Sequence, residues 1–174
     1  EQENGVSYEA KVKGAIYANY IKQSEEDGMI RKDLPFNPRL PVNTYWDIGT
    51  DDDMVCIFKQ KTEIGETVID FFEDQSGLGT DELARMLADK GYYYNKHQHP
   101  WDDNIRQKGK KVKTFKQHFM QSMRDYRVTG STVVASRDST KQLGVNRART
   151  RFHEYYWNTS NPNVELLLNH LKQH

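Results

Sequence analysis

The stretch Pro41-Val42-Asn43-Thr44-Tyr45-Trp46-Asp47-Ile48-Gly49 predicts a buried strand over Val42 to Ile48 that ends in a carboxylate and a glycine turn. Three further acids, Asp51, Asp52 and Asp53, follow closely. Carboxylates at this density repel one another unless a cation neutralises them, and hard oxygen ligands suit Mg²⁺ or Mn²⁺. The stretch therefore indicates either a metal site at the end of a strand or a solvated acidic turn.

Length and composition limit the class of protein. The 174 residues are enough for one domain with a hydrophobic core, and no apolar stretch of about 18 residues predicts a membrane span. The single cysteine, Cys56, excludes an internal disulfide and a cysteine-based zinc site, and it fits a reducing, cytoplasmic setting. Because the formal net charge is +0, the overall charge says nothing about nucleic acid.

The segments after Gly49 predict a regular order of strands and helices. Met54 to Gln60 and Thr67 to Phe72 are predicted strands, which together with the first strand predict an antiparallel meander. The predicted elements that follow are a helix over Asp81 to Lys90 with Thr80 as its N-cap and Gly91 at its end, a strand within Tyr92 to Trp101, a helix over Thr114 to Asp125, a short strand over Thr132 to Ala135, a long helix over Ser139 to Tyr156 and a final helix from Pro162. This order predicts an α/β fold in which a mixed central sheet, an antiparallel meander plus parallel strands, is flanked by helices.

The N-terminal part has a different composition. Apolar residues at helical spacing run from Tyr8 to Ile21, and Pro35, Pro38 and Pro41 punctuate the segment that follows. We therefore expect a helical arm and a proline-rich linker over residues 1–40, and a compact domain over residues 41–174.

A second carboxylate, Asp102, follows His97-Gln98-His99-Pro100-Trp101, where Pro100 suits a strand end. If the strands before Asp47 and Asp102 are parallel neighbours, the two acids face one another. Two carboxylates that bridge a metal pair are what metal-assisted phosphodiester cleavage needs. The alternative is an Asp-Asp turn that caps a helix. His97 and His99 share one face of the predicted strand, where they either pack and hydrogen-bond near the site or bind zinc together with Asp102.

Basic residues follow Asp102 at once and surround Gly109. This group predicts contact with the phosphates of a nucleic acid, with the solvated start of a helix as the alternative; it consists of Arg106, Lys108, Lys110, Lys111, Lys113 and Lys116. A second basic group, Arg147, Arg149 and Arg151, lies on the predicted long helix, where its alternation spreads it around the helix.

Several motifs together resemble the nuclease domain of tailed-phage terminase large subunits. The stretch 41–49 with Asp52 resembles the opening of that domain, and His99-Pro100-Trp101-Asp102 resembles its Pro-His-Asp element, with Trp101 in place of the usual His. Three more segments are similar to the family: Val68 to Glu73 followed by Ser76 to Gly79, Gly144-Val145-Asn146-Arg147-Ala148-Arg149, and the region from Ser7 to Gly28. The resemblance covers nearly the whole chain.

The resemblance implies a ribonuclease H-like fold and metal-dependent cutting of DNA during viral genome packaging. It implies Asp47 and Asp102 as the first two acidic ligands of Mg²⁺ or Mn²⁺, with Asp52 or Asp53 as an auxiliary ligand. The implied partners are double-stranded DNA, the terminase ATPase motor domain, the small terminase subunit and the portal, in the cytoplasm of the host cell.

Two departures from the family pattern keep other functions open. No Gly-x-x-x-x-Gly-Lys-Ser/Thr motif of an ATPase motor occurs. No Ala-Asp-Ala-Phe-like segment, the family's source of a third acid, precedes His174. We therefore expect either a domain truncated at its C-terminus or an unexpected third acid, Glu165 or Glu154.

If two carboxylates bind metal too weakly for turnover, the chain is a catalytically weak DNA-binding or docking module. A sugar kinase or actin-type ATPase is a third alternative, because Asp47-Ile48-Gly49-Thr50 is similar to the phosphate loop of those proteins. The acids directly after Thr50 argue against it, since they would repel phosphate.

Overall fold

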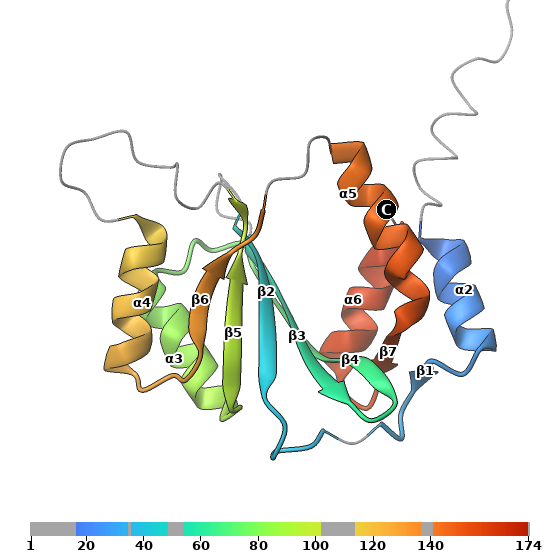
Figure 1. Ribbon diagram of the computed structural model, residues 1–174, viewed down its shortest axis with the longest axis horizontal. Helices are drawn as coiled ribbons and strands as arrows, with labels where there is room; N and C mark the ends of the chain where they lie inside the picture. Colours follow the sequence, from blue (N-terminus) through green and yellow to red (C-terminus); the bar gives the residue numbers. More distant parts are fainter. Residues whose placement is uncertain (1–16, 35, 49–53, 102–113, 137–140, 174) are drawn as a thin grey trace, which may run out of the picture.

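Among the described residues, seven strands form one mixed sheet in the order β1-β7-β4-β3-β2-β5-β6 (Figure 1). The computed structural model describes residues 17–34, 36–48, 54–101, 114–136 and 141–173. The strands are β1 (Ile30–Arg31), β2 (Val42–Ile48), β3 (Met54–Thr62), β4 (Gly65–Asp74), β5 (Tyr94–His99), β6 (Ser131–Val134) and β7 (Tyr155–Asn158).

The sheet combines antiparallel and parallel pairs as predicted. β2, β3 and β4 form the antiparallel meander. β5 pairs with β2 in parallel, β6 pairs with β5 in parallel, and β7 pairs with β4 in parallel. The mixed character of the predicted sheet is therefore confirmed, and the predicted strands of the meander match the observed ones closely.

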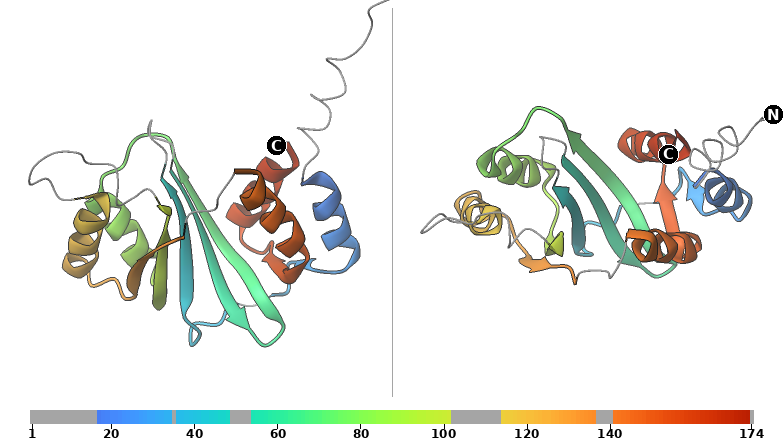
Figure 2. Two further views of the ribbon diagram at one scale, coloured as in Figure 1. Left: turned by 45° about the horizontal axis from the view of Figure 1, so that its top comes forward. Right: turned by 90° about the horizontal axis from the view of Figure 1, so that it is seen from above.

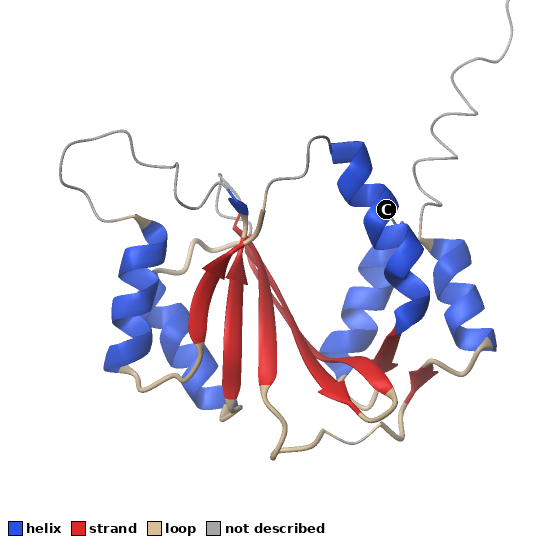
Figure 3. Cartoon of the chain, in the orientation of Figure 1, coloured by secondary structure: helices blue, strands red, loops and turns tan. Residues whose placement is uncertain are grey.

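Five described helices cover the two faces of the sheet (Figure 2). They are α2 (Ala18–Glu26), α3 (Thr80–Lys90), α4 (Phe115–Asp125), α5 (Lys141–Arg151) and α6 (Pro162–Gln173). Helices α3 and α4 lie on one side, and α2, α5 and α6 lie on the other, which gives the layers that Figure 3 separates by colour. None of the described helices is long and apolar enough to cross a membrane.

Each side of the sheet has its own hydrophobic core, because successive side chains of a strand point to opposite faces. Under α3 and α4 the core is built from Trp46, Phe58, Leu83, Leu87 and Phe119, among others. Under α2 and α6 it is built from Ile21, Val68, Phe152, Trp157 and Leu167, among others. Cys56 is buried in the first of these cores as a free thiol.

The ends of α3 and α4 show ordinary capping chemistry, with one correction to the prediction. Thr114 caps α4, since its side chain accepts a hydrogen bond from the Gln117 backbone nitrogen. The prediction of Thr80 as the N-cap of α3 is wrong, because Gly79 is the cap and donates its N–H to Glu82 at 2.7 Å. Gly91 ends α3 in the left-handed conformation with φ 66°, as predicted.

The predicted long helix over Ser139 to Tyr156 is wrong beyond Arg151. α5 ends at Arg151, a short 3-10 turn η2 follows (Phe152–Glu154), and the chain then enters β7. Phe152 and Trp157 are both buried in the second core. Aromatic residues favour a strand that can pair, and the open edge of β4 supplies that pairing, so tertiary structure overrides the helical pattern here.

Residues 8–16 of the helical segment predicted from Tyr8 to Ile21 lie outside the described residues, and the described part extends further than predicted. α2 continues to Glu26, beyond the expected end at Ile21, and Ile21 is fully buried in the core under α6. The two-residue strand β1, which was not predicted, pairs with β7. The division into an arm over residues 1–40 and a domain over residues 41–174 stays a prediction.

A buried carboxylate, Asp70 in β4, ties both layers of helices to the sheet. Its Oδ2 accepts hydrogen bonds from Lys90 of α3 and, at 3.1 Å, from the Tyr92 hydroxyl, while its Oδ1 accepts one from Asn163 of α6 at 2.9 Å. Burial alone pushes the pKa of Asp70 upward, but the hydrogen bonds from Lys90 and Asn163 outweigh it and hold the pKa below its ordinary value of 3.8. The ionised form is therefore part of the folded structure.

We predict that Asp70→Ala lowers the free energy of unfolding at pH 7 by about 3 kcal/mol, because Lys90 then lacks its largely buried partner. The folded-state pKa is depressed, so this stabilisation is present above about pH 4 and is lost as the pH falls further. Denaturant unfolding measures the change, with Asp89→Ala at an exposed position of α3 as the control, expected within about 0.5 kcal/mol of the wild type. Equal losses in the two variants would contradict this role.

Candidate functional site

The strands that precede the two predicted acids are parallel neighbours. Tyr45 of β2 lies opposite Gln98 of β5, and the pairing continues back through Thr44 opposite His97. The carboxyl ends of β2 and β5 therefore meet at one edge of the sheet (Figure 1). Asp47 lies at this edge and is exposed. The parallel pairing of β2 with β5 is confirmed, and the meeting of Asp47 with Asp102 stays a prediction.

Most of the other predicted site residues lie outside the described residues. These are Asp102, Asp52 and Asp53, together with the basic residues Arg106, Lys108, Lys110, Lys111 and Lys113. The remaining basic residue, Lys116, lies in the first turn of α4 and is half-buried. Within the described part of the chain, no group of three or more His, Cys, Asp or Glu side chains could hold a metal ion. The ligand roles of these acids stay predictions.

A row of side chains crosses the sheet from Asp47. Asp47 lies opposite Val55 of β3, and Val55 lies opposite Glu73 of β4. The three residues share the face that carries α6, since Val55 packs against the second core. The Glu73 carboxylate lies 3.3 Å from Nδ1 of His170 on α6. A cavity of about 300 Å³ opens beside this pair, lined by Met54, Val55, Glu73, Asp74, Gln75, His170 and Gln173.

No local sequence signal marks Glu73 as a neighbour of Asp47. Their relation depends on the pairing register of three strands, and that register is visible only in the folded sheet. Adjacent strands are about 4.8 Å apart, so the two backbones are separated by roughly 10 Å. Glu73 is the described acid that lies in the same row and on the same face as Asp47.

The two acids considered as a third ligand lie elsewhere. Glu165 is in the first turn of α6 and lies 3.8 Å from Lys32. Glu154 accepts a hydrogen bond from Arg151 at 2.9 Å. Along α6, His170 is level with the row of Asp47, whereas Asn163 contacts Asp70, which pairs with Phe58 further along β3. The C-terminal half of α6, rather than Glu165, therefore lies level with Asp47.

A cationic and aromatic cluster lies further along the same face. Lys59 lies opposite Asn43, with its Nζ 4.0 Å from the Tyr45 ring centroid and 4.4 Å from that of Tyr155. The same Nζ lies 4.0 Å from Glu66, and the side chain is 12% exposed. Burial lowers the pKa of Lys59 from its ordinary value. The rings hold this positive charge beside Tyr45, which is two positions before Asp47 on the same face.

The histidines predicted near the site lie on the other face of the sheet. His97 and His99 are buried under α3 and α4, where both rings contact Phe119. His97 Nε2 lies 2.9 Å from the carbonyl oxygen of Thr129, which can only accept, so Nε2 carries the proton. Nδ1 then accepts from the Thr44 hydroxyl at 2.8 Å. Both ring nitrogens are occupied, and the alternative of a zinc site that uses His97 is wrong.

Gly130 makes room for this histidine. Its φ is 96°, and a Cβ there would lie 2.9 Å from His97 Nε2 and 3.2 Å from the carbonyl oxygen of Asn95. Only glycine fits both the conformation and the space. The turn before β6 is therefore adapted to the buried imidazole that joins β2 to β5.

We predict that His97 makes the protein lose stability in mild acid. Burial lowers the pKa of His97 from 6.5 to about 4, so between these pH values the unfolded chain binds more protons than the folded one. Stability therefore falls as the pH drops through this window, by about 3 kcal/mol in total. Denaturant unfolding of the wild type and of His97→Gln at several pH values measures the effect, since the carboxamide does not titrate.

The His97→Gln protein should show a flatter dependence of stability on pH than the wild type. His118→Gln, at an exposed position of α4, is the matched control and should keep the wild-type slope. Parallel curves for the wild type and His97→Gln would mean that another group causes the acid sensitivity.

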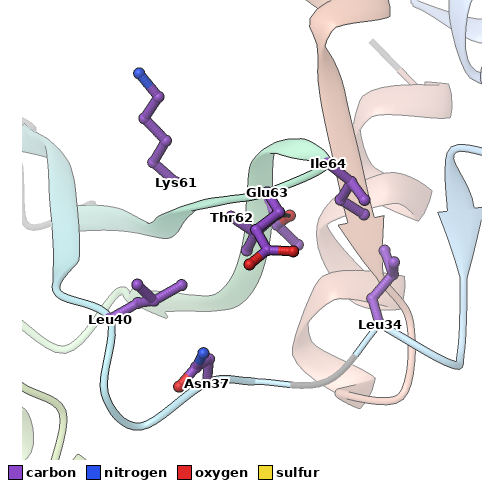
Figure 4. A pocket seen from close by; sticks show the side chains of 8 residues that line it. Leu34, Asn37, Leu40, Lys61, Thr62, Glu63 and Ile64 are labelled. Atoms are coloured by element: carbon purple, nitrogen blue, oxygen red, sulfur yellow. Dashed lines mark hydrogen bonds between the residues drawn. The ribbon is translucent and has the colours of Figure 1, made fainter.

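A larger cavity lies at the opposite end of the sheet (Figure 4). Its volume is about 530 Å³, and it is lined by Leu34, Asn37, Leu40, Lys61, Thr62, Glu63, Ile64 and Thr67. Thr62 is separated from Val55, the partner of Asp47, by the length of β3, which corresponds to roughly 20 Å. This cavity is therefore not part of the site around Asp47.

Comparisons with known proteins give matches at the level of structure. No protein-family model matches the chain, and no curated protein matches it in sequence. The structure of the P22 large terminase nuclease domain matches with a TM-score of 0.60 and 11% identity over 86% of this chain and 75% of that one.

Two structures of the large terminase from a thermophilic bacteriophage also match. One has a TM-score of 0.54 and 11% identity over 84% of this chain and 35% of that one. The other, in complex with ATP-gamma-S, has a TM-score of 0.56 and 13% identity over 91% of this chain and 37% of that one. The chain thus spans little more than a third of that large terminase. The mixed sheet flanked by helices is the ribonuclease H-like fold of phage large terminase nuclease domains, which confirms the predicted fold.

Proposed function

We propose that this chain is the nuclease domain of a viral genome-packaging terminase large subunit and that it cuts concatemeric double-stranded DNA by metal-dependent phosphodiester hydrolysis. The observation that supports this most directly is the parallel pairing of β2 with β5. It brings the ends of both strands to one edge, with the exposed carboxylate of Asp47 at that edge. The fold shared with terminase nuclease domains supports the same function.

In this proposal Asp47 and Asp102 hold Mg²⁺ or Mn²⁺, with Asp52 or Asp53 as an auxiliary ligand. The donor set is chemically suitable, since all four side chains are carboxylates and hard divalent cations prefer oxygen ligands. When bound, such ions activate water and stabilise the leaving oxygen of a phosphodiester. Asp47 is well suited to hold a ligand in place, because it lies on a central strand that is paired on both sides.

Charge next to the acids supports a nucleic-acid substrate. The basic residues Arg106, Lys108, Lys110, Lys111 and Lys113 follow Asp102 in sequence and would neutralise phosphates on either side of the scissile bond. Lys59 adds a positive charge held between two aromatic rings on the Asp47 face. The ATPase motor domain, the small terminase subunit and the portal are the partners that this function implies.

We predict that Asp47→Asn lowers Mn²⁺-dependent plasmid nicking by more than about 100-fold, which exceeds the loss typical of an outer-shell partner of a metal ligand. The amide keeps the shape of the side chain and removes the charge that binds the cation. Glu63→Gln, at the exposed turn between β3 and β4 at the opposite end of the sheet, is the matched control and should nick at the wild-type rate. An unchanged rate in Asp47→Asn would reject the assignment.

We predict that Lys110→Glu combined with Lys111→Glu weakens binding to double-stranded DNA and lowers the slope of log affinity against log salt by about 2 to 4, because two phosphate contacts are lost and two repulsions are added. Fluorescence anisotropy with a labelled duplex measures both quantities. Lys32→Glu combined with Lys61→Glu makes the same charge change at exposed positions away from Asp47 and should leave the slope unchanged.

The same two assays separate the proposal from its alternative. Salt-sensitive binding of DNA without nicking in either Mn²⁺ or Mg²⁺ would identify a docking module instead of a nuclease. Unaltered DNA affinity in the Lys110 and Lys111 variant would exclude the basic segment as a DNA contact under both functions.

A further inference from the structure

Helix α5 has a composition that core packing does not explain. Between Lys141 and Arg151 it carries Lys141, Arg147, Arg149 and Arg151 and no acidic residue. Surface helices usually bury an apolar stripe, but none of the described side chains of α5, residues 143–151, is buried. Its main packing contact is with the turn η2 that follows it. Packing in a hydrophobic core therefore does not account for the basic residues of this helix.

The base of α5 is fixed on the face of the sheet that carries Asp47. Arg151 Nε donates to Glu154 at 2.9 Å, and the next residue, Phe152, is buried and stacks on Trp157 with ring centroids 5.1 Å apart. Burial raises the pKa of Tyr45 and lowers that of Lys59, and the charge of Arg151 is near enough to pull both values downward. Tyr45 is two positions before Asp47 and on the same face, so the base of α5 lies next to the row of Asp47.

The helix extends toward the edge at which β2 and β5 end. Figure 1 shows α5 extending upward from β7 to the level of that edge. Figure 2 shows it on the side of the sheet away from α3 and α4. A helix of this length spans about 16 Å, which is enough to contact several phosphates of a DNA strand that passes Asp47.

The exposed side of α5 carries groups that recognise phosphate. Arg147 and Arg151 are one helical turn apart and both exposed, and Asn146 and Thr150 flank them on the same side. Arginine and asparagine side chains are among the usual donors to DNA phosphates, whereas the Thr150 hydroxyl already donates to the Arg147 carbonyl oxygen at 3.0 Å. Arg149 lies on the other side of the helix, where its Nε is buried without an acceptor among the described residues. Arg147 and Arg151 therefore form an exposed pair on one side of α5, opposite Arg149.

We propose that α5 holds the phosphate backbone of double-stranded DNA, through Arg147 and Arg151, against the sheet edge that carries Asp47. This rests on the proposed nuclease function for its location, but the DNA contact itself needs no metal. The contact is independent of base sequence, because it involves phosphates alone. The duplex is the occupant that the charge of the helix fits, since the exposed pair Arg147 and Arg151, on a helix without acidic residues, complements a polyanion.

The test measures binding of a fluorescein-labelled duplex of random sequence in EDTA, where cleavage cannot occur. For Arg147→Gln combined with Arg151→Gln we expect the Kd to rise about 10-fold and the slope of log affinity against log salt to fall by about 2. Arg147→Lys combined with Arg151→Lys keeps both charges and should retain most of the salt slope. Arg85→Gln combined with Arg124→Gln removes two exposed charges from α3 and α4 and should bind like the wild type.

Two outcomes overturn the inference. The first is wild-type affinity and salt slope in the Arg147 and Arg151 variant, with thermal unfolding showing that the variant is folded. The second is an equal loss of affinity in the Arg85 and Arg124 control. Loss of nicking in Asp47→Asn tests the nuclease proposal separately, so a wild type that binds DNA through α5 but never cuts would reject the nuclease and keep the DNA-binding role of α5.

Discussion

The parallel pairing of β2 with β5 is the constraint on which the rest of the structure depends. After the antiparallel meander the chain passes through α3 before β5 pairs with β2. A buried hydrogen bond of 2.8 Å between the Thr44 hydroxyl and Nδ1 of His97 joins these two strands. Trp46 donates to the same Thr44 hydroxyl, also at 2.8 Å. A shift of β2 by one residue relative to β5 would break the hydrogen bond between Thr44 and His97 and point the Asp47 side chain into the core. The register therefore sets both the packing of one face and the chemistry of the other.

The two faces of the sheet carry different kinds of side chain. Under α3 and α4 the side chains are mainly apolar, and His97 is kept neutral by its burial. On the other face the central strands carry Asn43, Tyr45 and Asp47, with the charges of Lys59 and Glu73 beside them. Asp70 connects the layers, because it binds Lys90 on one side and Asn163 on the other. Both faces have a hydrophobic core, and the part of the second face around Asn43, Tyr45 and Asp47 is polar, which suits a charged ligand.

The sequence alone was enough for elements whose pattern is local. The apolar run ending at Asp47 predicted β2 with its observed ends, and Gly91 marked the end of α3. β7 was not predicted, because the predicted helix runs to Tyr156, whereas Tyr155, Tyr156 and Trp157 pair with the edge of β4 as a strand. Glu73 was not predicted as a neighbour of Asp47, because their relation follows from the register of two strand pairs. His97 and His99 were correctly placed on a shared face, but periodicity could not tell which face the helices cover. The roles of Asp102 and of the basic residues 106–113 stay predictions.

The proposed function depends above all on a divalent cation that Asp47 and Asp102 share at the ends of β2 and β5. Anomalous diffraction from crystals soaked in Mn²⁺ tests this most directly, because the ion and its ligands are then located together. We predict an ion about 2.1 Å from a carboxylate oxygen of each residue. An ion bound elsewhere, or Asp47 and Asp102 side chains on opposite faces of the sheet with no ion between them, would contradict it.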